Sequence, residues 1–91
     1  MLKSKNKKLE QIPKLPGIYI MRDMVGNIIY IGKAKSLKSR LSSYFSADIN
    51  SKSTAIITAM CKIDYILCTS EREALLIERQ LINRIKPYFN S

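Results

Sequence analysis

Two spacings of apolar residues alternate along this chain. Short runs rich in isoleucine and tyrosine predict β-strands, and longer segments with apolar residues every three or four positions predict helices. In chain order, the expected elements are strands at 17–22 and 28–32, helices at 36–45 and 53–61, a strand at 63–68 and a helix at 70–85. This β-β-α-α-β-α order predicts an α+β domain in which helices flank a small three-stranded, antiparallel sheet.

Local signals mark the ends of two of these helices. Ser36 is a candidate N-cap, and Ser70 with Glu73 forms the Ser-x-x-Glu pattern of a capping box. Pro87 is expected to close the last helix, because the residue before a proline avoids helical backbone angles. The polar segment 46–52 is expected to be a loop between the first two helices.

The first two strands are expected to form a hairpin. Residues 23–26 place aspartate at the start of a turn and glycine where a positive φ is needed. With the turn on those four residues, Arg22 pairs with Asn27 and Tyr19 falls opposite Tyr30. Both phenols then share one face of the hairpin, whereas a slip of one residue would separate them.

One charged residue falls on the apolar stripe of each of two helices. In the first helix, Arg40 follows the same stripe as Leu37, Leu41 and Tyr44. In the last helix, Glu78 falls in the middle of an apolar face. The residues that define this second face are Ala74, Leu81, Ile82 and Ile85.

Charge on a buried face is costly unless it is paired or coordinated. One interpretation is a structural salt bridge between Arg40 and Glu78. The other is a cleft in which Glu78 binds a metal ion and Arg40 binds a phosphate. The sequence alone leaves both interpretations open.

Other candidate side chains surround these charges. Lys33 and Lys35 follow the second strand, either as a solvated turn or as phosphate contacts close to a helix N-terminus. A tyrosine in a strand is usually part of the core. The convergence of Tyr19, Tyr30 and Tyr44 on the side of Arg40 and Glu78 favours a functional site instead.

Length and charge limit the possible functions. The 91 residues suffice for one small domain, which we expect at 12–91 after a flexible basic arm at 1–11. The 16 Lys and Arg residues outnumber the 7 Asp and Glu residues, giving a net charge of +9. Such a balance favours nucleic acid as the partner over a membrane surface. No segment is long enough for a transmembrane helix.

The cysteine and histidine content excludes several kinds of chemistry. Cys61 and Cys68 form no Cys-x-x-Cys pair and the chain has no histidine, which excludes a zinc site and any histidine-dependent triad. Two cysteines without a secretory signal are typical of a reducing compartment, so we expect a cytoplasmic protein.

The motifs together resemble a known family. The residues that carry the likeness are Gly17-Ile18-Tyr19, Tyr30-Ile31-Gly32-Lys33, Arg40 and Glu78, supported by stretches at 15–19, 32–37, 40–45, 73–78 and 85–90. They resemble the GIY-YIG nuclease domain, most closely the N-terminal nuclease domain of UvrC-type excision-repair proteins. The likeness runs from about residue 12 to residue 90, nearly the whole chain.

The resemblance implies a metal-dependent phosphodiester cut. Glu78 would hold one Mg²⁺ or Mn²⁺ ion, with water in the remaining positions, as Mg²⁺ tolerates. Tyr30 would help to activate the attacking water, and Tyr19 would lie in the same hydrogen-bond network. Arg40 would stabilise charge on the scissile phosphate, and Lys33 would neutralise or position a phosphate.

The resemblance also implies lesser site residues and partners. Tyr44 and Asn90 match positions near the metal and the phosphate. The cut would leave a 5′-phosphate and a 3′-hydroxyl, on the 3′ side of a DNA lesion. The expected partners are DNA and other excision-repair proteins, with the domain itself a monomer that contacts no membrane.

Two other hypotheses stay open. A non-catalytic module with the same fold would bind nucleic acid through its lysines without cutting it. In a purely structural domain, Arg40 and Glu78 would only pair with each other.

Overall fold

The computed structural model describes residues 10–44 and 51–90. In chain order these residues form β1 (Gly17–Arg22), β2 (Ile28–Ala34), α2 (Leu37–Ser43), α3 (Ser51–Ala59), β3 (Lys62–Leu67), α4 (Glu71–Ile85) and a short 3-10 helix, η1 (Tyr88–Asn90). The predicted β-β-α-α-β-α order is confirmed, with η1 added after the last helix.

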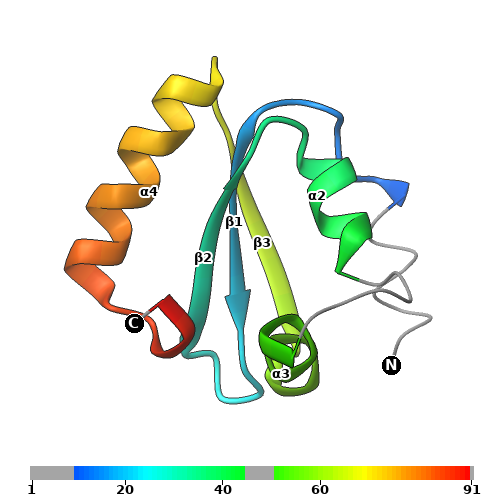
Figure 1. Ribbon diagram of the computed structural model, residues 1–91, viewed down its shortest axis with the longest axis vertical. Coiled ribbons are helices and arrows are strands. Elements are labelled where there is room, and N and C mark those ends of the chain that lie inside the picture. Colours follow the sequence, from blue (N-terminus) through cyan, green and yellow to red (C-terminus); the bar gives the residue numbers. More distant parts are fainter. Residues whose placement is uncertain (1–9, 45–50, 91) are drawn as a thin grey trace.

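The strands form one antiparallel sheet with β1 in the centre and β2 and β3 at its edges. Figure 1 shows α4 on one side of this sheet and α2 on the other. Successive side chains of β1 point alternately to the α4 side and to the α2 side of the sheet. Ile18 and Ile20 pack with Ala74 of α4, whereas Tyr19 and Met21 pack with α2 and α3. The predicted α+β sheet flanked by helices is therefore correct.

Some predicted boundaries differ from the structure. The α3 helix begins at Ser51, so the last two residues of the expected loop at 46–52 are helical, and it ends at Ala59 instead of residue 61. The predicted end of the first helix at residue 45 and most of the basic arm at 1–11 lie outside the described residues. In the part of the chain that the structure describes, no helix is long and apolar enough to cross a bilayer.

The last helix has the predicted caps, with one change. The Ser70 hydroxyl accepts from the Glu73 N–H at 3.1 Å, as a capping box requires. The Glu73 carboxylate, however, accepts from the N–H of Thr69, one residue before the N-cap. The helix closes at Lys86, whose left-handed backbone (φ 51°) lets its N–H reach the Ile82 carbonyl at 2.8 Å.

The predicted hairpin register is wrong by two residues. Tyr19 lies opposite Gly32, and Tyr30 lies opposite Met21. A bulge between Met21 and Arg22 shifts the pairing, and no periodicity in the sequence signals that extra residue. An even shift returns each side chain to its predicted face, so Tyr19 and Tyr30 still share one face of the sheet.

The turn explains where this register comes from. One carboxylate oxygen of Asp23 accepts from the N–H groups of Val25, Gly26 and Asn27 at 2.9–3.0 Å. The Asp23 N–H also donates to the Asn27 carbonyl, which makes the loop one residue longer than predicted. Gly26 adopts a φ of 102°, a conformation that favours glycine.

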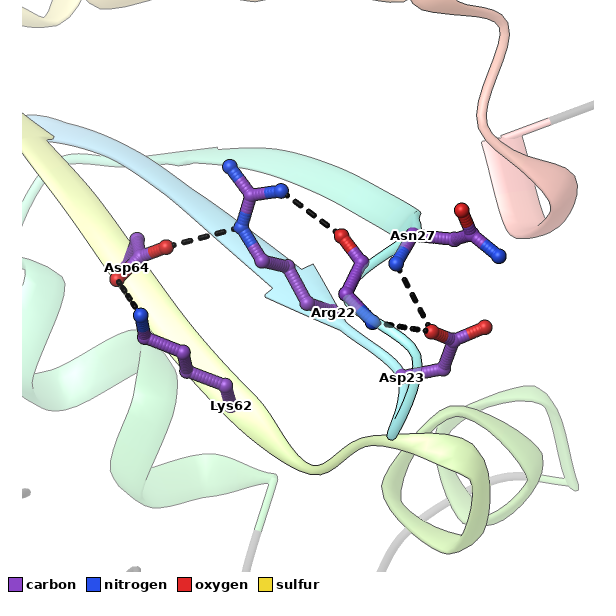
Figure 2. Close-up of polar contacts among 6 residues, drawn as sticks. Arg22, Asp23, Asn27, Lys62 and Asp64 are labelled. Carbon is purple, nitrogen blue, oxygen red and sulfur yellow. Dashed lines mark hydrogen bonds and ion pairs between the residues drawn. The ribbon is translucent and has the colours of Figure 1, made fainter.

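Charged side chains attach this turn to the third strand, as Figure 2 shows. Arg22 donates from Nε to Asp64 at 3.0 Å and from Nη1 to the Gly26 carbonyl at 2.9 Å. Lys62 lies 3.9 Å from the other oxygen of Asp64. These groups are partly exposed, so we expect each ion pair to contribute at most about 1 kcal/mol. Their role is to hold the hairpin against β3.

Candidate active site

Three tyrosines from β1, β2 and α2 gather on the α2 side of the sheet. The ring centroids of Tyr19 and Tyr30 are 6.1 Å apart, and those of Tyr19 and Tyr44 are 5.8 Å apart in an edge-to-face arrangement. The hydroxyl oxygens of Tyr19 and Tyr44 share a hydrogen bond of 3.0 Å. The structure thus brings the three predicted tyrosines into one cluster.

The glycine of each tripeptide makes room for a close contact. A Cβ atom on Gly32 would overlap the Tyr19 ring, which lies directly across the glycine from the neighbouring strand. A Cβ atom on Gly17 would overlap the Ile66 carbonyl and come within 2.8 Å of a Leu37 methyl group. Neither glycine has a positive φ, so space explains both positions better than backbone freedom does.

Burial keeps two of the phenols protonated. It raises the pKa of Tyr19 well above the ordinary value for a phenol, and the hydrogen bond with Tyr44 raises it further. Burial also raises the pKa of Tyr44 to about 12, although its bond with Tyr19 acts in the other direction. Tyr19 is 2% exposed. Tyr30 is only partly buried, so it is the phenol of the cluster that best reaches solvent.

Arg40 lies on the exposed side of α2, and the prediction that it faces the core is wrong. The buried residues of this helix are Leu37 and Leu41, with Tyr44 following at the C-cap. Arg40 falls at the border of that stripe, where a long side chain can place its charge in water. Its charge still reaches the cluster, because Arg40 lowers the pKa of Tyr19 and of Tyr44 against the effect of burial.

Arg40 also lines an open groove of about 620 Å³ beside the β2–α2 connection. The lining residues are Lys33, Ala34, Lys35, Ser36, Ser39, Arg40, Ser43 and Glu71. Lys33 belongs to β2, not to a turn, and its Nζ lies 4.0 Å from a carboxylate oxygen of Glu71. The three predicted phosphate-binding cations, Lys33, Lys35 and Arg40, therefore share one concave surface.

Glu78 lies on the opposite layer from the tyrosines and is partly buried. The apolar α4 side chains that pack on the sheet are Ala74, Ile77, Leu81 and Ile82. Glu78 follows Ala74 by one helical turn and lies between it and Ile82 on the same face, as predicted. Ile85, predicted for that face, is 38% exposed. Because α4 packs against β2, the outer edge of β2 is where groups from both layers can approach one another.

The structure disfavours the salt-bridge interpretation. Among the residues described, Arg40 and Glu78 form no ion pair with each other or with another side chain. The described part of the chain also has no group of three or more His, Cys, Asp or Glu residues that could hold a metal ion. A lone, partly buried carboxylate suits Mg²⁺, which keeps most of its water ligands, and does not suit zinc.

Asn90 occupies the outer edge of β2 beside Tyr30. Its side-chain oxygen accepts from the Ile31 N–H, and its side-chain nitrogen donates to the Ile31 carbonyl, both at 2.8 Å. The amide thus pairs with β2 as a neighbouring strand would. The polar atoms of Asn90 bind the Ile31 backbone, so this side chain positions the edge of β2.

One residue at the site was missed by the sequence reasoning. The Lys52 ammonium lies 5.5 Å from the centroid of the Tyr30 ring. The sequence predicts a polar loop at residue 52, whereas this residue belongs to the first turn of α3. The contact joins residues of α3 and β2 that lie 22 positions apart in the sequence, so no local signal could have found it.

Comparison with known proteins agrees with this geometry. Residues 15–91 match the model of the UvrC-like GIY-YIG domain. The chain is 49% identical over 85 residues to UvrABC system protein C of Solibacter usitatus, covering 91% of this chain. It is 46% identical over 84 residues to the same protein of Methanococcoides burtonii, covering 90% of this chain. The chain spans only 14% of the length of each of these relatives.

Solved structures of one domain match the whole fold. The N-terminal GIY-YIG endonuclease domain of UvrC from Thermotoga maritima, bound to magnesium as its catalytic divalent cation, superposes with a TM-score of 0.90 at 36% identity, each chain covered completely. Point variants of that domain with a tyrosine changed to phenylalanine, also bound to the cation, give the same TM-score at 35% identity. This chain therefore belongs to the UvrC-like GIY-YIG domain family.

Proposed function

We propose that this domain is a metal-dependent endonuclease that hydrolyses a phosphodiester bond in DNA. The observation that carries the proposal is the arrangement around β2. A solvent-reaching phenol, Tyr30, lies in a buried tyrosine cluster near Arg40, and a carboxylate without an ion-pair partner among the described residues, Glu78, projects from the helix packed on the same strand. A domain that only bound DNA would need no such carboxylate.

Glu78 is the proposed ligand of one Mg²⁺ or Mn²⁺ ion. The magnesium in the Thermotoga maritima domain supports this assignment. A single, partly buried carboxylate also suits Mg²⁺, because this ion keeps most of its water ligands. When bound, the ion supplies positive charge beside the reacting phosphate.

The tyrosines handle the proton in this proposal. The Tyr30 hydroxyl helps to activate a water molecule, which attacks the phosphorus atom and passes its proton through that hydroxyl to solvent, while the bond from phosphorus to the 3′-oxygen breaks. The products are a 5′-phosphate and a 3′-hydroxyl, whose proton comes from solvent. Tyr19 and Tyr44 stay protonated and hold the cluster in place, because burial raises the pKa of both.

The cations bind the substrate. Arg40 stabilises the charge that builds up on the scissile phosphate, the role in which a preorganised cation is most effective. Lys33 and Lys35 contact phosphates in the groove that they line with Arg40. Asn90 fixes the edge of β2 that carries Tyr30.

The relatives suggest the biological setting. UvrABC system protein C is much longer than this chain, so damage recognition and partner binding would lie in other regions. We propose incision of DNA 3′ of a lesion, together with other excision-repair proteins, in the cytoplasm. The two cysteines are unpaired, which suits a reducing compartment.

The test is nicking of supercoiled plasmid with Mg²⁺ or Mn²⁺, with EDTA as the control. The wild type is expected to nick only with the metal, and Glu78→Ala is expected to abolish nicking while the fold and DNA affinity persist. Nicking that survives this substitution would contradict the proposal. Metal-independent DNA binding without any nicking by the wild type would favour the non-catalytic module.

A further inference from the structure

We propose that Lys52 of α3 is a further substrate-binding residue, which contacts a backbone phosphate of the DNA strand as that strand passes across Tyr30. This inference rests on the proposed function. The observation is the position of the Lys52 ammonium, 5.5 Å from the centroid of the Tyr30 ring. Neither the family motifs nor the groove at Arg40 includes this residue.

The charge of Lys52 is available to a ligand. Its side chain is exposed, and within residues 10–44 and 51–90 no carboxylate forms an ion pair with it. A lysine near the start of a helix is also opposed by the helix dipole, so the stability of α3 does not account for it. The contact with the partly buried Tyr30 ring orients the ammonium but is weak, and the exposed Lys52 side chain keeps its outer face in water.

Lys52 extends the cationic surface to the other side of Tyr30. Lys33, Lys35 and Arg40 line the groove at the β2–α2 connection. Lys52 approaches Tyr30 from α3, a different element, which Figure 1 shows at the opposite end of the sheet from the start of α2. A strand whose scissile phosphate lies at Tyr30 therefore meets cations in the groove and at α3. Two contacts on either side of the cut fix the register of a flexible strand better than one does.

A cation that binds a backbone phosphate changes both the affinity for DNA and the dependence of that affinity on salt concentration. Each phosphate contact adds about 0.7–0.9 to the slope of log affinity against log salt concentration. One exposed charge pair changes the dissociation constant up to about fivefold. A lysine that merely rests on a tyrosine ring would change neither quantity.

The experiment compares four proteins: wild type, Lys52→Met, Lys52→Arg and Lys62→Met. Methionine keeps the length and the ring contact of Lys52 but removes its charge, and arginine keeps the charge. Lys62 is the matched control, because it lies on β3, the opposite edge of the sheet from β2. Binding of a fluorescent, nicked DNA duplex is measured in EDTA over a series of salt concentrations, so this readout needs no nuclease activity.

Lys52→Met is expected to lower the salt slope by about one unit and to weaken binding up to about fivefold. Lys52→Arg should behave as the wild type, and Lys62→Met should keep the wild-type slope. Equal slopes for Lys52→Met and wild type overturn the inference, as does an equal loss in Lys62→Met. These outcomes stand whether or not the wild type nicks DNA.

Nicking kinetics with Mg²⁺ separate the role of Lys52 from that of the catalytic groups. Loss of a phosphate contact is expected to raise KM with kcat within about twofold, because ground-state and transition-state binding weaken together. A fall in kcat at constant KM would show that Lys52 acts through Tyr30, and would overturn the proposed phosphate contact while leaving the endonuclease proposal intact.

Discussion

Replacing Gly32 by alanine tests whether the YIG glycine exists to accommodate the Tyr19 ring. In most strand positions, alanine is favoured over glycine by about 0.5–1 kcal/mol, because glycine loses more backbone freedom on folding. At Gly32, the added methyl group would overlap the ring atoms of Tyr19, a fully buried side chain in the centre of the sheet. The steric overlap therefore predicts that alanine lowers the free energy of unfolding, whereas the backbone entropy predicts that alanine raises it.

The magnitude follows from the contacts. Overpacking of a buried site costs about 1–3 kcal/mol. Moving the Tyr19 ring also breaks its 3.0 Å hydrogen bond to Tyr44, at a further cost of about 1 kcal/mol. After subtracting the backbone gain, Gly32→Ala is expected to lower the free energy of unfolding by about 1–3 kcal/mol. For a domain of this size, the melting temperature falls by about 5–20 °C.

Urea unfolding followed by circular dichroism measures the effect. In a Tyr19→Leu background the ring is absent, so Gly32→Ala should become neutral or stabilising, and a double-mutant cycle should show the difference as coupling. Gly26→Ala is the contrasting variant, because it is strained by a φ of 102° and has no neighbour within 4 Å. A melting temperature for Gly32→Ala at or above that of the wild type would refute the steric argument.

Three further predictions concern the same cluster and its edge. Tyr44→Phe is expected to cost about 1–3 kcal/mol in chemical denaturation, because it leaves the buried Tyr19 hydroxyl without its partner, and no change would contradict the role of the 3.0 Å bond. The folded-state pKa of Tyr44 is raised to about 12 and that of Tyr19 is raised as well, so the unfolded chain loses these protons first. Their contribution to stability is fully present below about pH 10, the pKa of a free phenol, and falls as the pH rises toward 12, by up to about 1.4 kcal/mol per pH unit for each group. Urea unfolding at pH 8 and pH 11 checks this fall, which should be smaller in Tyr44→Phe. Asn90→Ala removes two hydrogen bonds to Ile31 and is expected to cost about 1–2 kcal/mol and to speed hydrogen exchange at the Ile31 amide. An unchanged exchange rate there would show that Asn90 does not hold the strand edge.

Periodicity was sufficient to predict the fold. The apolar runs at 17–22 and 63–68 and the capped helix after Ser70 correspond closely to β1, β3 and α4. These elements carry strong local signals, because alternation, caps and prolines act within a few residues. The face shared by Tyr19 and Tyr30 was also correct, since any even shift of register preserves it.

The predictions that differ from the structure concern features that tertiary contacts determine. The bulge at Met21 depends on how Asp23 closes the turn with its carboxylate, which a spacing rule does not encode. The spacing of Arg40 along an apolar stripe predicts a place on the core, but the seven-residue helix α2 buries only Leu37 and Leu41. Lys52 was missed because its contact with Tyr30 joins two elements that are distant along the chain.

The central claim is that the α4 carboxylate and the tyrosine cluster form one metal-dependent site at the outer edge of β2. A crystal structure of the domain soaked with Mn²⁺, with the ion located by its anomalous signal, tests this claim most directly. We expect one ion with a Glu78 oxygen within about 2.0–2.6 Å, at the outer edge of β2. An ion held elsewhere, such as at Glu71 or Asp64, with no density at Glu78, would contradict it.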